Sequence, residues 1–536
     1  MHVSRLSLWS CTAAASAAVM PVRAQDLGLW LQFGRDAARS GSIQDVSGSS
    51  PGGLLASLAW TRALDSQGRA ISFVAQATPI VTQDLVLAAG SVLIGSSRVF
   101  SLYAIDRASG QVRWSSAIDA PALDSWSSPA ADVRAARVYV ASGSTLRAFN
   151  LANGALAWSA PLHAQVVNAS PLVLTDAQGR SRVFVTDFSE ADGQLYCFSA
   201  GGPLQPAAGT RLWSVPIGAT SGNTPASDGS RVFVSSLGDF AYSPGRIFAF
   251  NAWANDTPAP SWTFDNVIAE GFFSGLTVHG GSVYAGSYAF FGSTASANLV
   301  KLDAATGLLR WSTPSNRTSS TPVVIPPRGG GPLRVALSTG VQGFGSVPTL
   351  QVFADAGAGV SRIFDSASAT WADTNQNGRM DAGEFLSLGG WTGAPALVIS
   401  PVADTLLAQS PPTGSSTSFG SALRAVNLSL LASGPSAWQV GLSTQAGGAP
   451  AIATDGAGVN VYAVGSGGLI AFGPAAISGD VNRDGCVDIE DLYAFEQGVG
   501  ARDVNADGSI GDADRDALVG YLRRREPTDM RSGGPR

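Results

Sequence analysis

Residues 103–114, Tyr-Ala-Ile-Asp-Arg-Ala-Ser-Gly-Gln-Val-Arg-Trp, carry the pattern that decides the fold. An apolar run ends at Asp106, Gly110 follows, and a second run ends at Trp114. An Asp that opens a turn and a Gly that accepts positive φ favour a tight connection between two strands. The same order, with Asp or Asn, recurs at residues 147–158 and 300–311. Looser copies end at Trp213, Trp262 and Trp438, so the chain is predicted to repeat one hairpin.

A second marker precedes each hairpin: a small residue, usually followed by proline, and then an alternating apolar run. Proline suits the first residue of a strand, because that residue need not donate an N–H to the sheet. The marker recurs about every 50 residues, and each interval holds four short strand-like runs. Such units predict an all-β fold, a β-propeller, over residues 25–473. Eight unit starts predict eight blades: Thr78-Pro79, Ser128-Pro129, Ser170-Pro171, Thr224-Pro225, Gly275-Leu276, Thr321-Pro322, Ala394-Pro395 and Ala449-Pro450.

The repeat region has an extra strand-like run at its start and lacks the last strand of a unit at its end. Residues 58–60, Leu-Ala-Trp, precede the first unit start, whereas residues 469–472 end the last unit without a tryptophan after them. We expect the strand around Trp60 to complete the eighth blade, because a closed ring lacks the sheet edges that an open array exposes. The tryptophans are expected to pack between blades.

Composition limits the classes of function. The 536 residues are 45% hydrophobic and 13% charged, with a net charge of −6 and a single lysine, Lys301. No basic block is present, so nucleic acid is not expected as a partner. With 3 Cys and 3 His, the chain has little material for a disulfide framework, a zinc site or a Ser/His/Asp triad. Cys197 lies in an apolar run and is expected to be a core thiol.

The N-terminus is typical of a signal peptide over residues 1–24. Arg5 precedes an apolar stretch, residues 6–20, and a small-x-small cleavage pattern ends at Ala24. No later segment is long and apolar enough to span a bilayer, so no transmembrane segment is expected. We therefore predict a secreted or extracytoplasmic protein, at the cell surface or in the periplasm. A buried N-terminal helix is the alternative for residues 1–24.

Two stretches resemble the pyrroloquinoline-quinone-type (PQQ-like) β-propeller repeat family, and the resemblance covers residues 26–473. Residues 30–41, which begin Trp-Leu-Gln-Phe-Gly-Arg-Asp and end Arg-Ser-Gly, look like its lead-in, and residues 104–114 look like its repeat core. The family includes quinone-dependent alcohol and glucose dehydrogenases as well as non-enzymatic scaffolds such as the outer-membrane assembly lipoprotein. The dehydrogenase branch implies a disulfide between adjacent cysteines over the quinone, and a calcium ion held by Glu, Asn and Asp. This chain has no adjacent cysteines, so we expect no PQQ and assign no catalytic residue.

The C-terminal segment contains two twelve-residue loops with oxygen ligands at the spacing of calcium-binding loops. Glycine stands at position 6 of each, where the chain must turn sharply, and position 7 contributes only its carbonyl. Two bound Ca²⁺ ions are expected, and a solvated acidic tail is the alternative. The candidate ligands are Asp480, Asn482, Asp484, Cys486, Asp488 and Asp491 in the first loop, and Asp503, Asn505, Asp507, Ser509 and Asp514 in the second.

Each loop leads into a short apolar helix, and the pair resembles the type I dockerin module over residues 478–525. Residues 474–477 are then a linker and residues 526–536 a tail. The resemblance implies a small α-helical, EF-hand-like domain and a cohesin-type protein partner. The loops start closer together than is usual in the family, and the positions that resemble the cohesin-contacting pair differ between the two copies. The module could alternatively stabilise the ring without any partner.

A third loop of this type interrupts the propeller in its longest gap between unit starts, at residues 373–384. Its candidate Ca²⁺ ligands fit the EF-hand loop positions, with Glu384 as a bidentate ligand. An insertion between strands tolerates such a loop because it lies at the surface. A plain polar loop is the alternative. The candidate ligands are Asp373, Asn375, Asn377, Arg379 through its carbonyl, Asp381 and Glu384.

These features lead to a functional expectation with one main alternative. We expect a secreted, non-catalytic binding or scaffold protein, tethered through the calcium-dependent module, with an unidentified ligand or protein at one propeller face. The alternative is a secreted enzyme. It would be a PQQ-dependent dehydrogenase or, by the association of dockerins with polysaccharide degradation, a component of a glycosyl-hydrolase complex.

Overall fold

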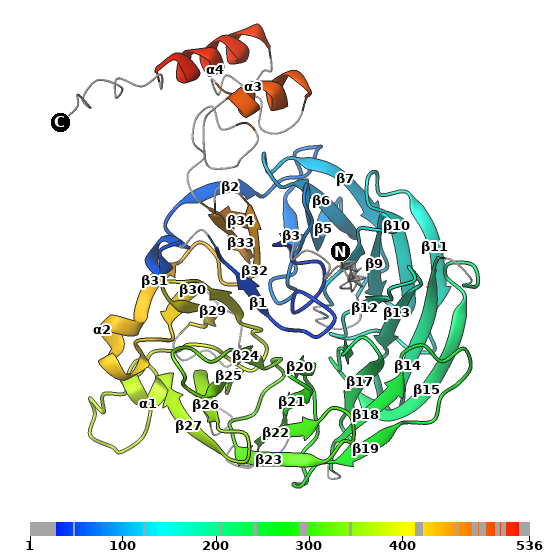
Figure 1. The fold of residues 1–536 in the computed structure, drawn as a ribbon, viewed down its shortest axis with the longest axis vertical. Helices are drawn as coiled ribbons and strands as arrows, with labels where there is room; N and C mark the ends of the chain where they lie inside the picture. Colours follow the sequence, from blue (N-terminus) through cyan, green and yellow to red (C-terminus); the bar gives the residue numbers. More distant parts are fainter. Residues whose placement is uncertain are drawn as a thin grey trace, which may run out of the picture.

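The computed structural model shows a ring of β-sheets with two helices outside it (Figure 1). The structure describes residues 28–473, except 47–48, 122–124, 126, 203–204, 239–243, 289–296, 342–345, 413–421 and 456–457, and then residues 481, 489–498, 504 and 511–524. Within these residues the strands form eight sheets. The predicted eight-bladed, all-β propeller is confirmed.

Each blade contains four antiparallel main strands, and the first strand of each blade lies nearest the axis of the ring. We number the blades from the first repeat. Blade 1 contains β3 (Ile71–Phe73), β4 (Ile80–Val81), β5 (Leu85–Ile94), β6 (Ser97–Asp106) and β7 (Val112–Ala117). Blade 2 contains β8 (Ala130–Asp132), β9 (Arg137–Ser142), β10 (Thr145–Asn150) and β11 (Leu156–Pro161). Blade 3 contains β12 (Leu172–Thr175), β13 (Ser181–Thr186), β14 (Ser189–Gly201) and β15 (Arg211–Thr220). Blade 4 contains β16 (Ala226–Ser227), β17 (Arg231–Ser236), β18 (Arg246–Asn251) and β19 (Trp262–Asp265).

The second half of the ring continues the pattern. Blade 5 contains β20 (Thr277–His279), β21 (Ser282–Gly286), β22 (Asn298–Asp303) and β23 (Leu309–Pro314). Blade 6 contains β24 (Val323–Ile325), β25 (Leu333–Thr339), β26 (Thr349–Asp355) and β27 (Val360–Asp365). Blade 7 contains β28 (Ala396–Ile399), β29 (Asp404–Ser410), β30 (Ala422–Asn427) and β31 (Gln439–Ser443), and β1 (Ser42–Gln44) pairs with β28 in parallel. Blade 8 contains β32 (Ala451–Asp455), β33 (Gly458–Gly465) and β34 (Gly468–Phe472). Short helices lie at α1 (Ser366–Thr370), α2 (Pro435–Trp438), η1 (Pro51–Gly53) and η3 (Leu431–Ser433).

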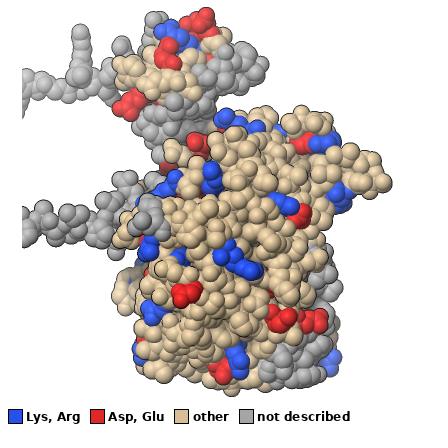
Figure 2. Space-filling view, turned by 90° about the vertical axis from the view of Figure 1, so that its right-hand side faces the viewer, with Lys and Arg blue, Asp and Glu red and all other residues tan. Residues whose placement is uncertain are grey.

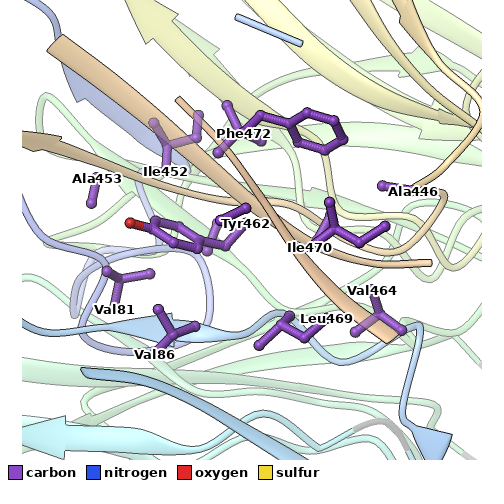
Figure 3. Packing of buried hydrophobic residues seen from close by; sticks show 14 of the residues in the cluster. Val81, Val86, Ala446, Ile452, Ala453, Tyr462, Val464, Leu469, Ile470 and Phe472 are labelled. Atoms are coloured by element: carbon purple, nitrogen blue, oxygen red, sulfur yellow. The ribbon is translucent and has the colours of Figure 1, made fainter. Parts of the chain in front are cut away.

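The ring closes as predicted, because a strand from the N-terminal region completes the last blade. β2 (Leu58–Arg62) pairs antiparallel with β34, with Trp60 opposite Ala471. Buried residues of blades 1 and 8 pack against each other at this junction. Figure 3 shows Tyr462, Leu469, Ile470 and Phe472 of blade 8 near Val81 and Val86 of blade 1.

The repeated tryptophans join neighbouring blades, as expected. Trp114 of β7 lies on the turn of blade 2, and its indole N–H donates to Leu151 O at 3.1 Å. Gly154 of that turn has φ +72°, and a Cβ there would lie 2.5 Å from the Trp114 ring. The glycine is therefore required both by its backbone conformation and by the close approach of the ring. The same ring-on-glycine contact joins Trp60 to Gly110, Trp158 to Gly209 and Trp262 to Gly307.

The Ser and Thr residues that precede the prolines of the repeat also hydrogen-bond between blades, which the sequence did not reveal. The backbone N–H of Thr78 donates to Ser128 Oγ at 2.9 Å, that of Ser128 to Ser170 Oγ at 2.9 Å, and that of Ser170 to Thr224 Oγ1 at 3.0 Å. These four residues are buried. A chain of hydrogen bonds thus links blades 1 to 4 near the axis.

Two further helices follow the ring, α3 (Ile489–Glu496) and α4 (Asp512–Arg524), and lie outside it in Figure 1. Their contact contains a small core of Val481, Phe495, Val504 and Leu518. Within the described parts of the chain, no helix has the length and apolar character needed to cross a membrane.

Candidate functional site

The turns that lead into the innermost strands surround the axis at one end of the ring, which we call the mouth. Neighbouring turns contact one another. The N–H of Asn168 donates to Ser125 Oγ at 3.3 Å, and the N–H of Ser319 donates to Trp391 O at 2.6 Å. Residues 28–45 lie on the inner strands along the axis, in dark blue at the centre of Figure 1. The mouth residues used below are Phe273, Tyr288, Arg317 and Trp391.

Three aromatic rings from two blades lie in a row at the mouth. The ring centroids of Phe273 and Tyr288 in blade 5 are 4.7 Å apart, with an interplanar angle of 54°. Trp391, just before blade 7, lies 5.2 Å from Tyr288 at 34°. Offset and tilted pairs of this kind are favourable aromatic contacts. The turn before β28 thereby brings a tryptophan of one blade onto a tyrosine two blades away.

An arginine accompanies the aromatic row. Arg317, in the turn before β24, places its guanidinium carbon 5.4 Å from the ring centroid of Tyr288. The two residues are 2% and 6% exposed. Burial raises the pKa of Tyr288, although the Arg317 charge acts in the opposite direction, so the phenol stays neutral at physiological pH. The buried guanidinium of Arg317 would attract an anion, and the aromatic rings beside it would stack on a planar one.

Trp391 adds a hydrogen-bond donor to this cluster. Its indole N–H is buried and has no hydrogen-bond partner among the residues that the structure describes. A buried donor without a partner costs free energy, and a ligand that accepts this N–H would recover it. Sequence reasoning missed the whole cluster, because its members are separated by many residues and form no motif.

The predicted calcium loop at residues 373–384 brings its polar side chains together. Glu384 Oε1 accepts the N–H of Thr374 at 2.9 Å, and the hydrogen bond from the Thr374 hydroxyl lowers the pKa of Glu384. The backbone N–H of Asn377 donates to Asp373 Oδ1 at 3.0 Å, and the side-chain Nδ2 of Asn377 donates to Asp381 Oδ2 at 2.6 Å. Asn375 also donates to Asp381, at 2.8 Å, and Arg379 donates its N–H to Asn377.

Of the candidate ligands in the C-terminal loops, the structure describes only the one at the last position of each loop. Asp491 accepts the N–H of Val481 at 2.6 Å, and Asp514 accepts the N–H of Gly511 at 2.9 Å. Both aspartates are buried. The other candidate ligands of these loops lie outside the described residues: Asp480, Asn482, Asp484, Cys486, Asp488, Asp503, Asn505, Asp507 and Ser509. The signal-peptide and tail predictions concern residues outside the described part as well.

Other titratable groups offer little chemistry. Cys197 is buried, as expected, and burial raises its pKa to about 12, so it is not a reactive thiolate. Across the residues that the structure describes, no group of three or more His, Cys, Asp or Glu side chains is placed to hold a metal ion. Figure 2 shows positive and negative side chains interspersed over the face in view, without a field of one sign.

A hollow of about 340 Å³ lies elsewhere, between blades 1 and 2. Thr82, Asp84 and Arg113 line it together with apolar residues. Arg113 is engaged there, because it donates to Asp106 Oδ2 at 2.5 Å. This hollow offers a smaller set of converging groups than the mouth.

Two solved structures share much of this ring. The quinohemoprotein alcohol dehydrogenase ADHIIG from Pseudomonas putida HK5 superposes with a TM-score of 0.50 and 14% identity, over 82% of this chain and 76% of that one. A europium-containing methanol dehydrogenase gives a TM-score of 0.50 and 11% identity, over 83% of this chain and 91% of that one. At this identity the likeness concerns the fold. No curated protein sequence matches the chain.

These neighbours overturn one expectation. The interpretation of the protein as a non-catalytic scaffold is wrong, because the two structural neighbours named above are quinoprotein-type dehydrogenases and favour the enzyme alternative. The sequence argument treated the scarcity of His and the missing cysteine pair as signs of inertness. That argument did not consider the mouth, where a charged and aromatic cluster assembles from residues that form no motif.

The family assignment comes from the repeat region itself. The family described as outer membrane protein assembly factor BamB matches residues 55–250 and 202–337, which together span more than half of the chain. Propellers of this kind are typically periplasmic or extracellular, in agreement with the expected export. The chain belongs to this family of PQQ-like repeat propellers.

Proposed function

We propose that the protein is an extracytoplasmic enzyme whose active site is the mouth, where a planar, anionic small molecule binds as substrate or cofactor. The observation that carries the proposal is the buried guanidinium of Arg317 over Tyr288, in line with Phe273 and Trp391. An arginine binds carboxylates through charge-assisted hydrogen bonds, and aromatic faces accept a flat ring. The dehydrogenase neighbours favour an oxidoreductase.

Pyrroloquinoline quinone, the cofactor that the family implies, fits this chain only in part. It is planar and carries carboxylates, which suits Arg317 and the aromatic row. The chain has no adjacent cysteines to cover it, and its described residues hold no cluster of three or more His, Cys, Asp or Glu side chains for the accompanying calcium. The residues therefore do not fit the complete quinone site, and we assign neither a catalytic base nor a reaction step to them.

The test is a binding experiment at the mouth. Pyrroloquinoline quinone, with and without Ca²⁺, and pyridine-2,6-dicarboxylate are titrated against the protein by calorimetry, and dye-linked oxidation of short alcohols is assayed in parallel. We expect a planar carboxylate to bind and Arg317→Gln to weaken binding by about tenfold to a hundredfold, because a charged hydrogen-bond donor is lost.

Arg246→Gln is the matched control, since Arg246 forms an exposed ion pair with Asp265 on blade 4. This variant should bind like the parent protein. If no planar carboxylate binds, or if both variants lose the same affinity, the mouth is not the site.

We also propose that the C-terminal segment is a dockerin-like module that binds two Ca²⁺ ions. Supporting this, Asp491 and Asp514 occupy the same position of the two loops. Both are buried carboxylates in the first turn of their helix, and each accepts a backbone N–H from its own loop. Val481 and Val504, each at loop position 2, share one small core. Calcium also suits the oxygen-rich spacing.

Calcium titration of the full chain after chelation tests this module. Asp491→Asn together with Asp514→Asn should reduce the number of bound ions by two and leave the ring intact by circular dichroism. An unchanged stoichiometry would contradict the assignment. Attachment to a cohesin-type partner stays a prediction, and a pull-down with and without chelator addresses it.

A further inference from the structure

Residues 28–45, which we call the axial segment, contact the innermost strand of every blade. Trp30 pairs with Val81 of β4, with N···O distances of 3.0 and 2.6 Å. Gly41 adjoins Val323 of β24 in blade 6. In the other blades an inner-strand N–H donates to the segment: Ala131 to Leu31 O, Val173 to Gln32 Oε1, Ser227 to Ala37 O, Val278 to Ala38 O, Leu397 to Gly41 O and Thr454 to Gly28 O, all at 2.7–2.9 Å.

Two side chains anchor the segment. Gln32 makes a reciprocal pair with the backbone of Val173: its Oε1 accepts the N–H at 2.9 Å and its Nε2 donates to the carbonyl at 3.3 Å. Arg39 is fully buried, and its guanidinium donates to Pro225 O at 2.9 Å and to Pro171 O at 3.2 Å. Those carbonyls open the inner strands of blades 3 and 4. The buried guanidinium is thus held by neutral oxygens of the ring.

The axial segment thus contacts the ring as an extended peptide contacts the exposed edges of β-strands, through backbone hydrogen bonds and two anchored side chains. Main-chain hydrogen bonds supply affinity in such complexes, and side chains in defined pockets supply specificity. The ring leaves the inner edges of its first strands without a neighbouring strand, and the axial segment occupies those edges. The covalent link from the segment to the ring leaves through Val46, which is 92% exposed. The segment and the ring are therefore joined at one exposed point.

We propose that the axis of the ring is a peptide-binding site, occupied in this chain by its own residues 28–45. Covalent attachment keeps the local concentration of the segment high, so it outcompetes other peptides. The kind of partner the site accepts is an extended peptide that places a glutamine and an arginine as Gln32 and Arg39 do. The same surface would accept this segment from a second copy of the chain.

The experiment separates the segment from the ring after folding. A recognition sequence for a site-specific protease is inserted after Val46 in the full chain, and the folded protein is cut and passed over a sizing column. We expect the N-terminal fragment to stay with the ring on the column and to leave the folded ring only slowly. A labelled synthetic peptide of residues 26–46 should then bind to rings from which the fragment has been washed out.

Substitutions identify the anchor. Arg39→Gln should release the cut fragment at least about tenfold faster, because charge-assisted hydrogen bonds are lost. Arg35→Gln is the control, since both arginines lie in the segment at positive φ and Arg35 forms an ion pair with Asp36 of the segment itself, at 3.7 Å. If Arg39→Gln does not fold, Gln32→Ala takes its place in the same comparison. Immediate loss of the fragment from a ring that stays folded, equal release from both variants, or failure of the peptide to rebind would overturn the proposal.

Discussion

The charged cluster around Asp355 provides a direct test of how neighbouring blades are held together. Asp355, at the end of β26 in blade 6, accepts hydrogen bonds from Lys301 Nζ at 2.7 Å, Trp311 Nε1 at 3.0 Å and Tyr284 OH at 3.0 Å, all from blade 5. The side chains of Asp355 and Lys301 are 1% and 13% exposed. Asp355→Ala leaves a buried ammonium, an indole N–H and a phenol without their common acceptor.

We expect Asp355→Ala to lower the free energy of unfolding by about 3–5 kcal/mol, the range for breaking a buried ion pair on one side. Urea unfolding followed by tryptophan fluorescence measures this change. Asp265→Ala is the control, because the Arg246–Asp265 pair is exposed and should contribute about 0–1 kcal/mol. A loss below about 1 kcal/mol for Asp355→Ala, or a loss equal to the control, would refute the assignment of this cluster as an interblade clamp.

The same cluster predicts a pH dependence. Burial alone would raise the pKa of Asp355, but the hydrogen bonds from Lys301, Gly357 and Trp311 outweigh it, so the folded-state pKa is lowered. A lowered pKa means that the carboxylate stabilises the fold above its unfolded pKa of about 4 and loses this contribution as the pH falls through the folded value. The difference between parent and Asp355→Ala should therefore shrink below about pH 4. A difference that stays constant down to the acid transition would contradict this explanation.

Three further changes test separate parts of the structure. Gly154→Ala should destabilise the ring by about 1–3 kcal/mol in urea unfolding, because φ is positive there and the Trp114 ring fills the space of a Cβ; an unchanged midpoint would argue against the ring-on-glycine contact. Thr224→Val should cost about 1–3 kcal/mol, since it removes the acceptor of a buried N–H in the chain that links blades 1 to 4; a neutral effect would show that this N–H finds another acceptor. Asp373→Ala with Glu384→Ala should remove one Ca²⁺ ion from the stoichiometry of the full chain, and an unaltered ion count would refute the third calcium loop.

Local patterns predicted much of the ring. The turn glycines and the tryptophans stand at fixed offsets, so the hairpins, the number of blades and the closing strand at Trp60 could be predicted from residues close in sequence. Loop 373–384 was singled out by the same kind of short-range pattern. Its polar side chains hydrogen-bond one another, and calcium binding there stays a prediction. Such features need only short-range geometry.

Contacts between distant residues could not be predicted in this way. The lead-in at residues 30–41 was recognised from its resemblance, but nothing local indicates that Gln32 meets Val173 or that Arg39 meets Pro225. The mouth is a similar case. Arg317, Tyr288 and Trp391 come from segments that precede or belong to three different blades, and they meet only because the folded ring brings those segments together.

The pairing of β2 with β34 in blade 8 has a consequence for how the ring unfolds. A linear array of repeats frays from its terminal units, because each of them has only one neighbour. Here β2 binds β34, so the first and last parts of the propeller sit in one sheet and neither can peel away alone. Every blade of the closed ring therefore has a neighbour on both sides, and blade 8 is the one sheet in which strands from the two ends of the repeat region pair. Resistance to proteolysis should therefore depend on this one seam far more than on any other blade.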